Sequence, residues 1–159
     1  MKLVILGISA TMLIAAAIIF GPSLFGGGGS GKAQVNPAEY DAGDISMEAG
    51  LLKRTYEVKN VGQDDLKIEN IFTSCDCTRA IFRIADKVSP EFGMPGMGQQ
   101  PILWSATLAP GEKGELEMIF DPAFHGHDAL GPVARAAYLE TSDLQNRKVE
   151  VRLFANVTH

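Results

Sequence analysis

The sequence predicts an all-β sandwich of about seven strands with Greek-key connections, preceded by one N-terminal transmembrane helix. Three observations predict it. From Val35 onward, apolar and polar residues alternate with a period of two, which is typical of half-buried strands. Turn-forming residues recur about every ten residues, and no helical period follows Val35. An uncharged apolar run, Leu3 to Phe20, lies near the N-terminus.

Residues 1–25 form the predicted membrane anchor. The apolar run continues to Phe25, and about 20 helical residues are enough to cross the hydrocarbon core. The charge of Lys2 favours a cytoplasmic N-terminus, so residues 3–25 would lie in the bilayer and the remaining chain on its periplasmic or extracellular side. The alternative is a cleaved signal peptide, because Ala15 and Ala17 give a small-x-small pattern. Both interpretations place the C-terminal domain outside the cytoplasm.

A glycine-rich segment, residues 26–34, follows the anchor. Its tract from Gly26 to Lys32 lacks the G-x-x-x-x-G-K-[ST] spacing and the preceding strand of a phosphate-binding loop. Tracts of this composition behave as flexible tethers. We therefore expect a flexible linker at 26–34 and one domain over residues 35–159, with about 127 residues after Lys32 available to build it.

Turn residues bound each predicted strand. Asn60 to Asp65 is a turn rich in Asn, Gly and Asp, and Asp121-Pro122 ends a strand because proline cannot donate to a sheet ladder. The predicted strands span residues 40–45, 51–60, 66–72, 78–84, 114–120, 133–140 and 148–157. Their number and spacing indicate an immunoglobulin-like sandwich. The side chains expected to be buried between its sheets are Tyr56, Val58, Leu66, Ile68, Leu116, Met118, Phe120, Val151 and Leu153.

One stretch, the predicted inserted loop at residues 85–104, does not fit a strand. Its prolines and glycines oppose regular structure, and long loops in compact domains are usually functional or disordered. The loop also carries four large apolar side chains, and an exposed patch of that kind usually marks a contact. The residues expected to bind a protein partner are Phe92, Met94, Met97 and Trp104. The alternative is that the loop folds over one end of the sandwich and covers its core.

Five short motifs follow one another along the chain. They are Tyr40-Asp41-Ala42-Gly43-Asp44-Ile45, Tyr56-x-Val58-x-Asn60-Val61-Gly62, Leu66-x-Ile68, Thr73-Ser74-Cys75-Asp76-Cys77-Thr78 and Pro110-Gly111-Glu112-Lys113-Gly114. This combination resembles a widespread bacterial domain-of-unknown-function family, marked by an S-C-G-C-T turn and distantly akin to ASH/hydin and PapD-like immunoglobulin domains. The resemblance runs from about residue 38 to residue 157. It implies an immunoglobulin-like sandwich in secreted or envelope-anchored proteins, with no established activity.

The chain departs from that family at two places. Asp76 stands at the glycine position of the cysteine turn, where aspartate would tolerate a positive φ less readily than glycine. The segment from Thr78 to Pro110 is longer than the family pattern, and the excess coincides with the 85–104 loop. We therefore expect the insertion, and not the cysteine turn, to carry the partner recognition of this particular protein.

The Cys75-x-Cys77 turn has three interpretations. Two thiolates with methionines nearby would suit Cu(I), whereas the usual C-x₂₋₄-C spacing of a zinc site is absent. In an oxidising compartment the two cysteines would form a disulfide, whose small ring makes it reducible. In the third interpretation they are small side chains packed into a turn. The candidate metal ligands are Cys75, Cys77, His125 and His127. We expect no cofactor, and a bound copper ion is the alternative.

Charge and motifs argue against several function classes. The net charge is −5 with no basic run, which disfavours nucleic acid as a partner. No G-x-S-x-G elbow or carboxylate cluster is present, so we expect no enzymatic activity and identify no small-molecule substrate. We expect a membrane-anchored, exported interaction module, an accessory or structural subunit of a larger membrane complex. Its partners would be the lipid bilayer and a membrane or exported protein. A copper-handling envelope protein is the alternative, and a thiol-redox protein is a third.

Overall fold

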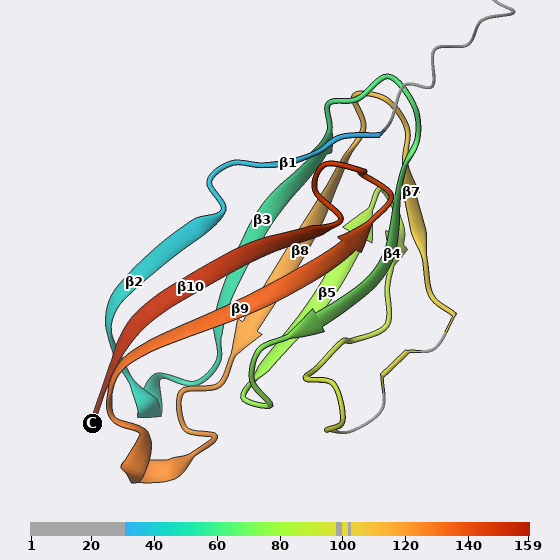
Figure 1. The fold of residues 1–159 in the computed structure, drawn as a ribbon. Helices are drawn as coiled ribbons and strands as arrows, with labels where there is room; N and C mark the ends of the chain where they lie inside the picture. Colours follow the sequence, from blue (N-terminus) through green and yellow to red (C-terminus); the bar gives the residue numbers. More distant parts are fainter. Residues whose placement is uncertain (1–30, 98–99, 102) are drawn as a thin grey trace, which may run out of the picture.

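The computed structural model describes residues 31–97, 100–101 and 103–159 as two β-sheets that pack face to face (Figure 1). These residues form ten strands and two short 3₁₀ helices, which confirms the all-β prediction. Within the same ranges, no helix is long and apolar enough to cross a membrane. The predicted anchor at residues 3–25 lies outside the described residues.

The first sheet contains five strands in the order β1-β3-β8-β5-β6, and every neighbouring pair is antiparallel. Strands β5 and β6 form a tight hairpin in which Ile84 pairs with Lys87. The strand bounds are Ala33–Val35 (β1), Leu52–Asn60 (β3), Thr78–Ile84 (β5), Lys87–Val88 (β6) and Lys113–Phe120 (β8).

The second sheet contains five strands in the order β2-β10-β9-β4-β7. The pair β2 and β10 is parallel, whereas the other pairs are antiparallel. The strand bounds are Glu39–Ser46 (β2), Leu66–Thr73 (β4), Ala106–Leu108 (β7), Gly131–Thr141 (β9) and Lys148–Thr158 (β10). The 3₁₀ helix Met47–Ala49 follows β2, and the 3₁₀ helix Gly126–Ala129 precedes β9.

The connections are those of an immunoglobulin-like Greek key. Strands β3, β4, β5, β8, β9 and β10 correspond in chain order to the strands lettered B to G in immunoglobulin domains. The first sheet then contains B, E and D side by side, and the second contains C, F and G. This is the division of strands between the two sheets that defines the immunoglobulin sandwich.

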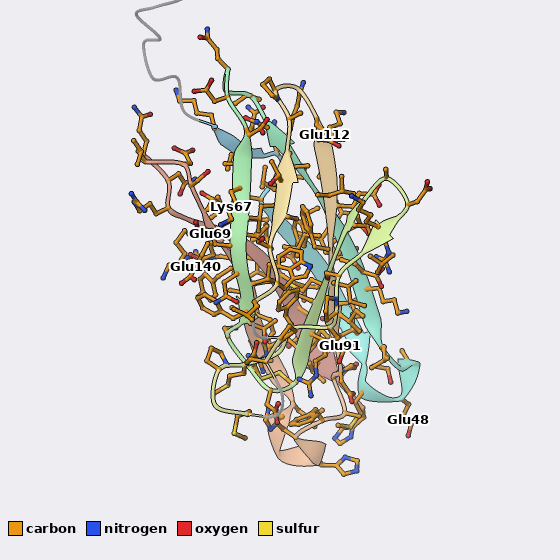
Figure 2. The ribbon with its side chains drawn as sticks, turned by 90° about the vertical axis from the view of Figure 1, so that its right-hand side faces the viewer. Glu48, Lys67, Glu69, Glu91, Glu112 and Glu140 are labelled. Carbon is orange, nitrogen blue, oxygen red and sulfur yellow. A yellow bond between two sulfur atoms is a disulfide. The ribbon has the colours of Figure 1, made fainter. Side chains whose placement is uncertain are left out.

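The inward-facing side chains of both sheets form one core. Figure 2 shows these side chains filling the space between the sheets, with Lys67, Glu69 and Glu140 on the outside. All nine side chains predicted to be buried are at most 2% exposed. Strand β8 approaches its neighbour closely at Gly114, where an added Cβ would lie 2.4 Å from the ring of Phe82. A larger residue at this position would displace the ring from the core.

All seven predicted strands are present, but the prediction of about seven strands is too low. The three additional strands, β1, β6 and β7, contain only two or three residues each. Segments this short show no periodicity of their own, and they exist because a longer strand beside them supplies hydrogen-bond partners.

The predicted linker boundary at residue 34 is also wrong. Ala33 and Gln34 pair with β3, so they belong to the domain. Gly31 is already buried, and a Cβ there would lie 2.5 Å from the Cα of Leu66. Residues 31–34 are therefore part of the domain, because side chains and backbone of the β3–β4 region hold this segment in place.

The 85–104 insertion is more regular and more buried than predicted. Phe92 forms a β-bridge with Ala80 and is completely buried, so its predicted exposure is wrong. Trp104 packs against the core, with its ring 5.0 Å from that of Phe92. Met94 is half-buried and Met97 is 48% exposed. The alternative interpretation, in which the loop covers core, therefore holds for Phe92 and Trp104.

Asp143 ties the N-terminal strand to the β9–β10 turn. It is 2% exposed, and its carboxylate accepts hydrogen bonds from the backbone N–H groups of Ala33 (3.1 Å), Gln145 (2.9 Å) and Asn146 (3.3 Å). Burial acts to raise the pKa of Asp143, but these three donors and the charge of Lys32 outweigh it and hold the pKa below its ordinary value. The ionised form therefore stabilises the fold.

The contribution of ionised Asp143 to the free energy of unfolding is complete above the ordinary carboxyl pKa of about 3.9. It is lost as the pH falls through the lower pKa that Asp143 has in the folded protein. We expect Asp143→Asn to lower the free energy of unfolding by about 2 kcal/mol near neutral pH, and the difference from wild type to shrink below about pH 4. Urea titrations at neutral and acidic pH measure this difference. Asp65→Asn, at an exposed carboxylate, is the control. A difference that does not change with pH contradicts the assignment.

Candidate functional site

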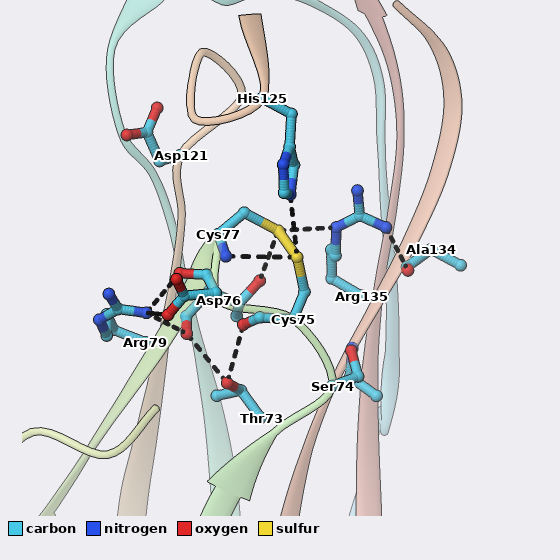
Figure 3. Close-up of a disulfide and its surroundings, with 12 residues drawn as sticks. Thr73, Ser74, Cys75, Asp76, Cys77, Arg79, Asp121, His125, Ala134 and Arg135 are labelled. Atoms are coloured by element: carbon cyan, nitrogen blue, oxygen red, sulfur yellow. Dashed lines mark hydrogen bonds and ion pairs between the residues drawn. A yellow bond between two sulfur atoms is a disulfide. The ribbon is translucent and has the colours of Figure 1, made fainter. Parts of the chain in front are cut away.

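The Cys75–Cys77 turn joins β4 to β5 at one end of the sandwich (Figure 3). The buried hydroxyl of Thr73, the last residue of β4, lies 3.1 Å from the carbonyl of Cys75 and 2.9 Å from that of Thr78. The Ser74 hydroxyl accepts a hydrogen bond of 2.9 Å from a backbone N–H of β9. Hydrogen bonds within the turn and to the neighbouring strand β9 thus hold the turn in place.

The two cysteines form a disulfide in this structure, as one of the three sequence interpretations predicts. The two sulfur-bearing residues differ in accessibility. Cys77 is 2% exposed, whereas Cys75 is half-buried. The backbone N–H of Cys77 lies 3.2 Å from the Sγ atom of Cys75. The Cys75 side of the bond is therefore the side that a reagent in solvent reaches.

Asp76, the middle residue of the turn, holds an arginine. The Arg79 guanidinium contacts the carbonyl of Asp76, lies 3.3 Å from its Oδ1 atom and 3.4 Å from a carboxylate oxygen of Glu91 (Figure 3). Among the described non-glycine residues, only Ala85 and Leu103 have positive φ. Asp76 therefore keeps an ordinary backbone conformation in place of the one that glycine would allow, and its carboxylate supplies an ion pair.

Two basic side chains face the disulfide from other elements (Figure 3). His125, in the loop between β8 and β9, places Nε2 3.4 Å from the Sγ atom of Cys75. Arg135, on the inward side of β9, donates from Nε to the Sγ atom of Cys77 at 3.0 Å. Its guanidinium lies 5.5 Å from the ring centroid of Phe120. Burial lowers the pKa of Arg135, but a guanidinium stays protonated at neutral pH.

Three of the four predicted metal ligands come together. The ligand atoms of Cys75, Cys77 and His125 all lie within 4.8 Å of one another. His127 is not part of this cluster, and its ring lies 5.5 Å from that of His159. Sequence reasoning missed Arg135. The only signal for it was its position on the inward face of a strand, where an arginine needs a partner.

A groove of about 590 Å³ lies on the side of the sandwich where β6 and β7 are the edge strands. Both ends of the 85–104 insertion line it, through residues 85–89 and Trp104, and residues 105–107 continue this wall into β7. Phe82, Ile84 and Trp104 give it apolar walls, and Val88 beside them is 60% exposed. This groove was not predicted, because it depends on the two short strands that periodicity does not reveal.

The fold and the turn together define an immunoglobulin-like domain with a disulfide-bonded C-x-C turn. Residues 33–91 match the model of a family described as a protein of unknown function (DUF1573). The matched segment runs from β1 past β6 and includes the cysteine turn, although it is less than half of the 159 residues. It confirms the resemblance to a family of unknown function that the ordered motifs indicate. No curated protein matches the chain.

Several solved structures are similar to this chain. One is a protein of unknown function from Porphyromonas gingivalis W83, with a TM-score of 0.59 and 17% identity, covering 79% of this chain and 46% of that protein. The chain thus spans less than half of that protein's length. Another is a family 123 glycoside hydrolase from Clostridium perfringens, with a TM-score of 0.52 and 5% identity, covering 80% of this chain and 27% of the hydrolase. At these identities the likeness concerns the fold alone.

The ASH/PapD-like domain 7 of human CEP192 is a third similar structure. Its TM-score is 0.47 with 16% identity, and the alignment covers 82% of this chain and 87% of that domain.

Proposed function

We propose that this protein is a membrane-tethered, exported interaction module that binds a protein partner in the groove between β6 and β7. It would serve as an accessory or structural subunit of a larger membrane complex. The observation that carries the proposal is the groove itself, where apolar side chains next to the core meet two unpaired sheet edges. Apolar grooves at sheet edges accept extended segments of partner proteins.

The opposite edge of the second sheet suits such binding less well. Strand β2, at the far edge of the second sheet, carries Glu39, Asp41 and Asp44, and Gly43 has a left-handed φ of 64°. Charges and irregular backbone on an edge oppose the addition of a strand. At the groove, by contrast, Val88 exposes an apolar side chain beside free backbone groups of β6. An extended segment with apolar side chains is therefore the partner that this side fits.

The insertion contributes to the groove through both of its ends. Trp104 forms part of the wall, and its ring is held edge-on by Phe92 at 5.0 Å and by Phe82 at 6.2 Å. Two of the predicted contact residues thus take different parts: Trp104 would touch the partner, and Phe92 would hold Trp104 in place. Partner contacts by Met94 and Met97 remain a prediction.

The location proposed for this module is the periplasmic or extracellular face of a membrane, with residues 3–25 as the anchor. The disulfide supports this location, because disulfides persist in oxidising compartments. We assign the groove to binding and not to catalysis, because two of its charged residues, Asp86 and Lys87, are exposed to solvent and the third, Glu112, accepts a hydrogen bond from the backbone N–H of Ala109.

Val88→Asp is expected to reduce partner binding about tenfold or more, because binding would bury a carboxylate against the apolar side chains of the partner and of Phe82, Ile84 and Trp104. The side chain is 60% exposed, so the fold should not depend on it. The measurement is copurification of the tagged full-length protein from detergent-solubilised native membranes, with the partner identified by mass spectrometry and quantified against the tagged chain.

Leu144→Asp is the matched control, since Leu144 is 68% exposed in the β9–β10 turn, outside the groove. This variant should keep the partner, and both variants should melt within about two degrees of wild type. Full partner occupancy in Val88→Asp, or equal loss from both variants, would exclude the groove as the binding site. Recovery of the mature protein in the soluble fraction would exclude the anchor.

A further inference from the structure

A cluster of soft ligand atoms lies at the end of the sandwich, and none of its residues lines the groove. The Sγ atoms of Cys75 and Cys77 and the imidazole of His125 come from two separate loops, and these ligand atoms lie within 4.8 Å of one another. Figure 3 shows the imidazole directed at the disulfide. We propose that reduction of this disulfide creates a Cu(I) site whose ligands are the two thiolates and the imidazole of His125.

The chemistry of the donors limits the choice of metal. Thiolates are soft ligands that favour Cu(I), and imidazole binds copper as well. This cluster of described residues supplies three ligands, and three-ligand sites of two cysteines and one histidine also hold Zn(II), with water as the fourth ligand. The donors therefore limit the metal to Cu(I) or Zn(II), and the charge around them decides between the two.

Arg135 supplies a charge argument that decides between the two metals. Two thiolates around a monovalent ion leave one net negative charge, which the guanidinium 3.0 Å from the Cys77 sulfur neutralises. The same thiolates around a divalent ion would be neutral, so the guanidinium would then be an uncompensated positive charge in a partly buried site. Arg135 thus favours a monovalent ion.

The contacts also indicate how the site opens. A thiolate of a dithiol reductant attacks the half-buried Cys75 sulfur, the S–S bond breaks, and Cys77 leaves as a thiolate beside the Arg135 guanidinium. The second thiol of the reductant then displaces Cys75. The reductant ends as a disulfide, and the protein has gained two electrons and two protons. Binding of Cu(I) releases the two thiol protons to solvent.

Competition with bicinchoninate, a chromogenic Cu(I) chelator, tests the proposal on reduced full-length protein in detergent micelles without oxygen. Reduced wild type is expected to take about one Cu(I) per chain from the chelator, and the oxidised protein is expected to take none. His125→Ala should bind about tenfold or more weakly, because it removes a ligand. His127→Ala, a histidine two residues away and outside the cluster, should bind as wild type does. Cys75→Ser and Cys77→Ser should each fail to take Cu(I) from the chelator.

Two further measurements make every outcome decisive. Thermal unfolding of each variant distinguishes a lost ligand from a lost fold, and the copper X-ray absorption spectrum of loaded wild type should show both sulfur and nitrogen neighbours. Sulfur neighbours alone, or unchanged affinity in folded His125→Ala, would overturn the role of His125. No uptake by reduced wild type, equal uptake by the oxidised form, or a preference for Zn(II) would overturn the site. Val88→Asp should bind Cu(I) normally, so this result is separable from partner binding.

Discussion

Phe120→Ala is expected to lower the free energy of unfolding by about 3–5 kcal/mol, the range found when a buried aromatic ring is deleted. Phe120 is 2% exposed at the end of β8, where it pairs with Leu52 on one side and Thr78 on the other. The variant loses the contacts of the ring, leaves a cavity and removes the aromatic face beneath Arg135. Because a domain is stable by only about 5–15 kcal/mol, this is a large share of the total.

Phe124→Ala provides a matched control, since it makes the same chemical change at a ring that is 44% exposed. We expect this variant to differ from wild type by less than about 1 kcal/mol. Urea unfolding of the three proteins under one set of conditions measures the difference. If the two variants were equally stable, the inward register of β8 would be incorrect.

Asn60→Ala is expected to lower the free energy of unfolding by about 3 kcal/mol, because it leaves one buried and three partly buried backbone groups without their partner. Asn60 is completely buried. Its Oδ1 atom accepts from the N–H groups of Lys32 (3.1 Å) and Gly62 (2.9 Å), and its Nδ2 donates to the carbonyls of Asp64 and Leu108, both at 2.8 Å. One side chain thus connects the N-terminal segment, the β3–β4 turn and the edge strand β7.

The control for this variant is Asn146→Ala, which removes an exposed amide from the β9–β10 turn. Its free energy of unfolding should be within about 0.5 kcal/mol of the wild-type value, as is usual for surface substitutions. Hydrogen exchange adds a local measurement. The N–H groups of Lys32 and Gly62 should exchange faster in Asn60→Ala and keep their wild-type rates in the control. Unchanged rates in Asn60→Ala would show that these donors do not depend on Asn60.

The long strands were predictable because each has one buried face. In β10, for example, the apolar positions 149, 151, 153, 155 and 157 all face the core, as the alternation indicates. Alternation fails where the register shifts. Between Ile68 and Asn70 a bulge moves Ile71 into the core and places Phe72 outside, where it stacks on Tyr138 at 4.9 Å. A bulge depends on the neighbouring strand and leaves no periodic signal.

The packing of the insertion cannot be predicted from the sequence for a related physical reason. Its prolines and glycines correctly indicate irregular backbone, but they do not show where its apolar side chains pack. Phe92 is buried because its backbone bridges to Ala80 of β5, with two hydrogen bonds of 2.8 and 2.9 Å. The bridge joins two segments that are separated by turns in the sequence. It is therefore a tertiary contact, which local sequence periodicity does not reveal.

The cysteine turn was visible in the sequence because its two sulfur atoms are close in the chain. Which histidine joins them was not visible. His125 and His127 were equivalent by spacing, and only the path of the loop after β8 brings His125 to the Cys75 sulfur and leaves His127 beside His159. Arg135 could have been noticed, since it shares the inward side of β9 with Ala137 and Leu139.

Site-specific photo-cross-linking from position 88 tests the central claim most directly. Val88 is replaced by a benzophenone-bearing amino acid in the full-length protein, and the cells are irradiated before membranes are prepared. Leu144, which is 68% exposed against 60% for Val88 and lies outside the groove, is the matched position. An interaction module that binds in the groove predicts one dominant protein adduct from position 88 and none from position 144. No adduct from position 88, or the same adduct from both positions, would contradict partner binding in the groove.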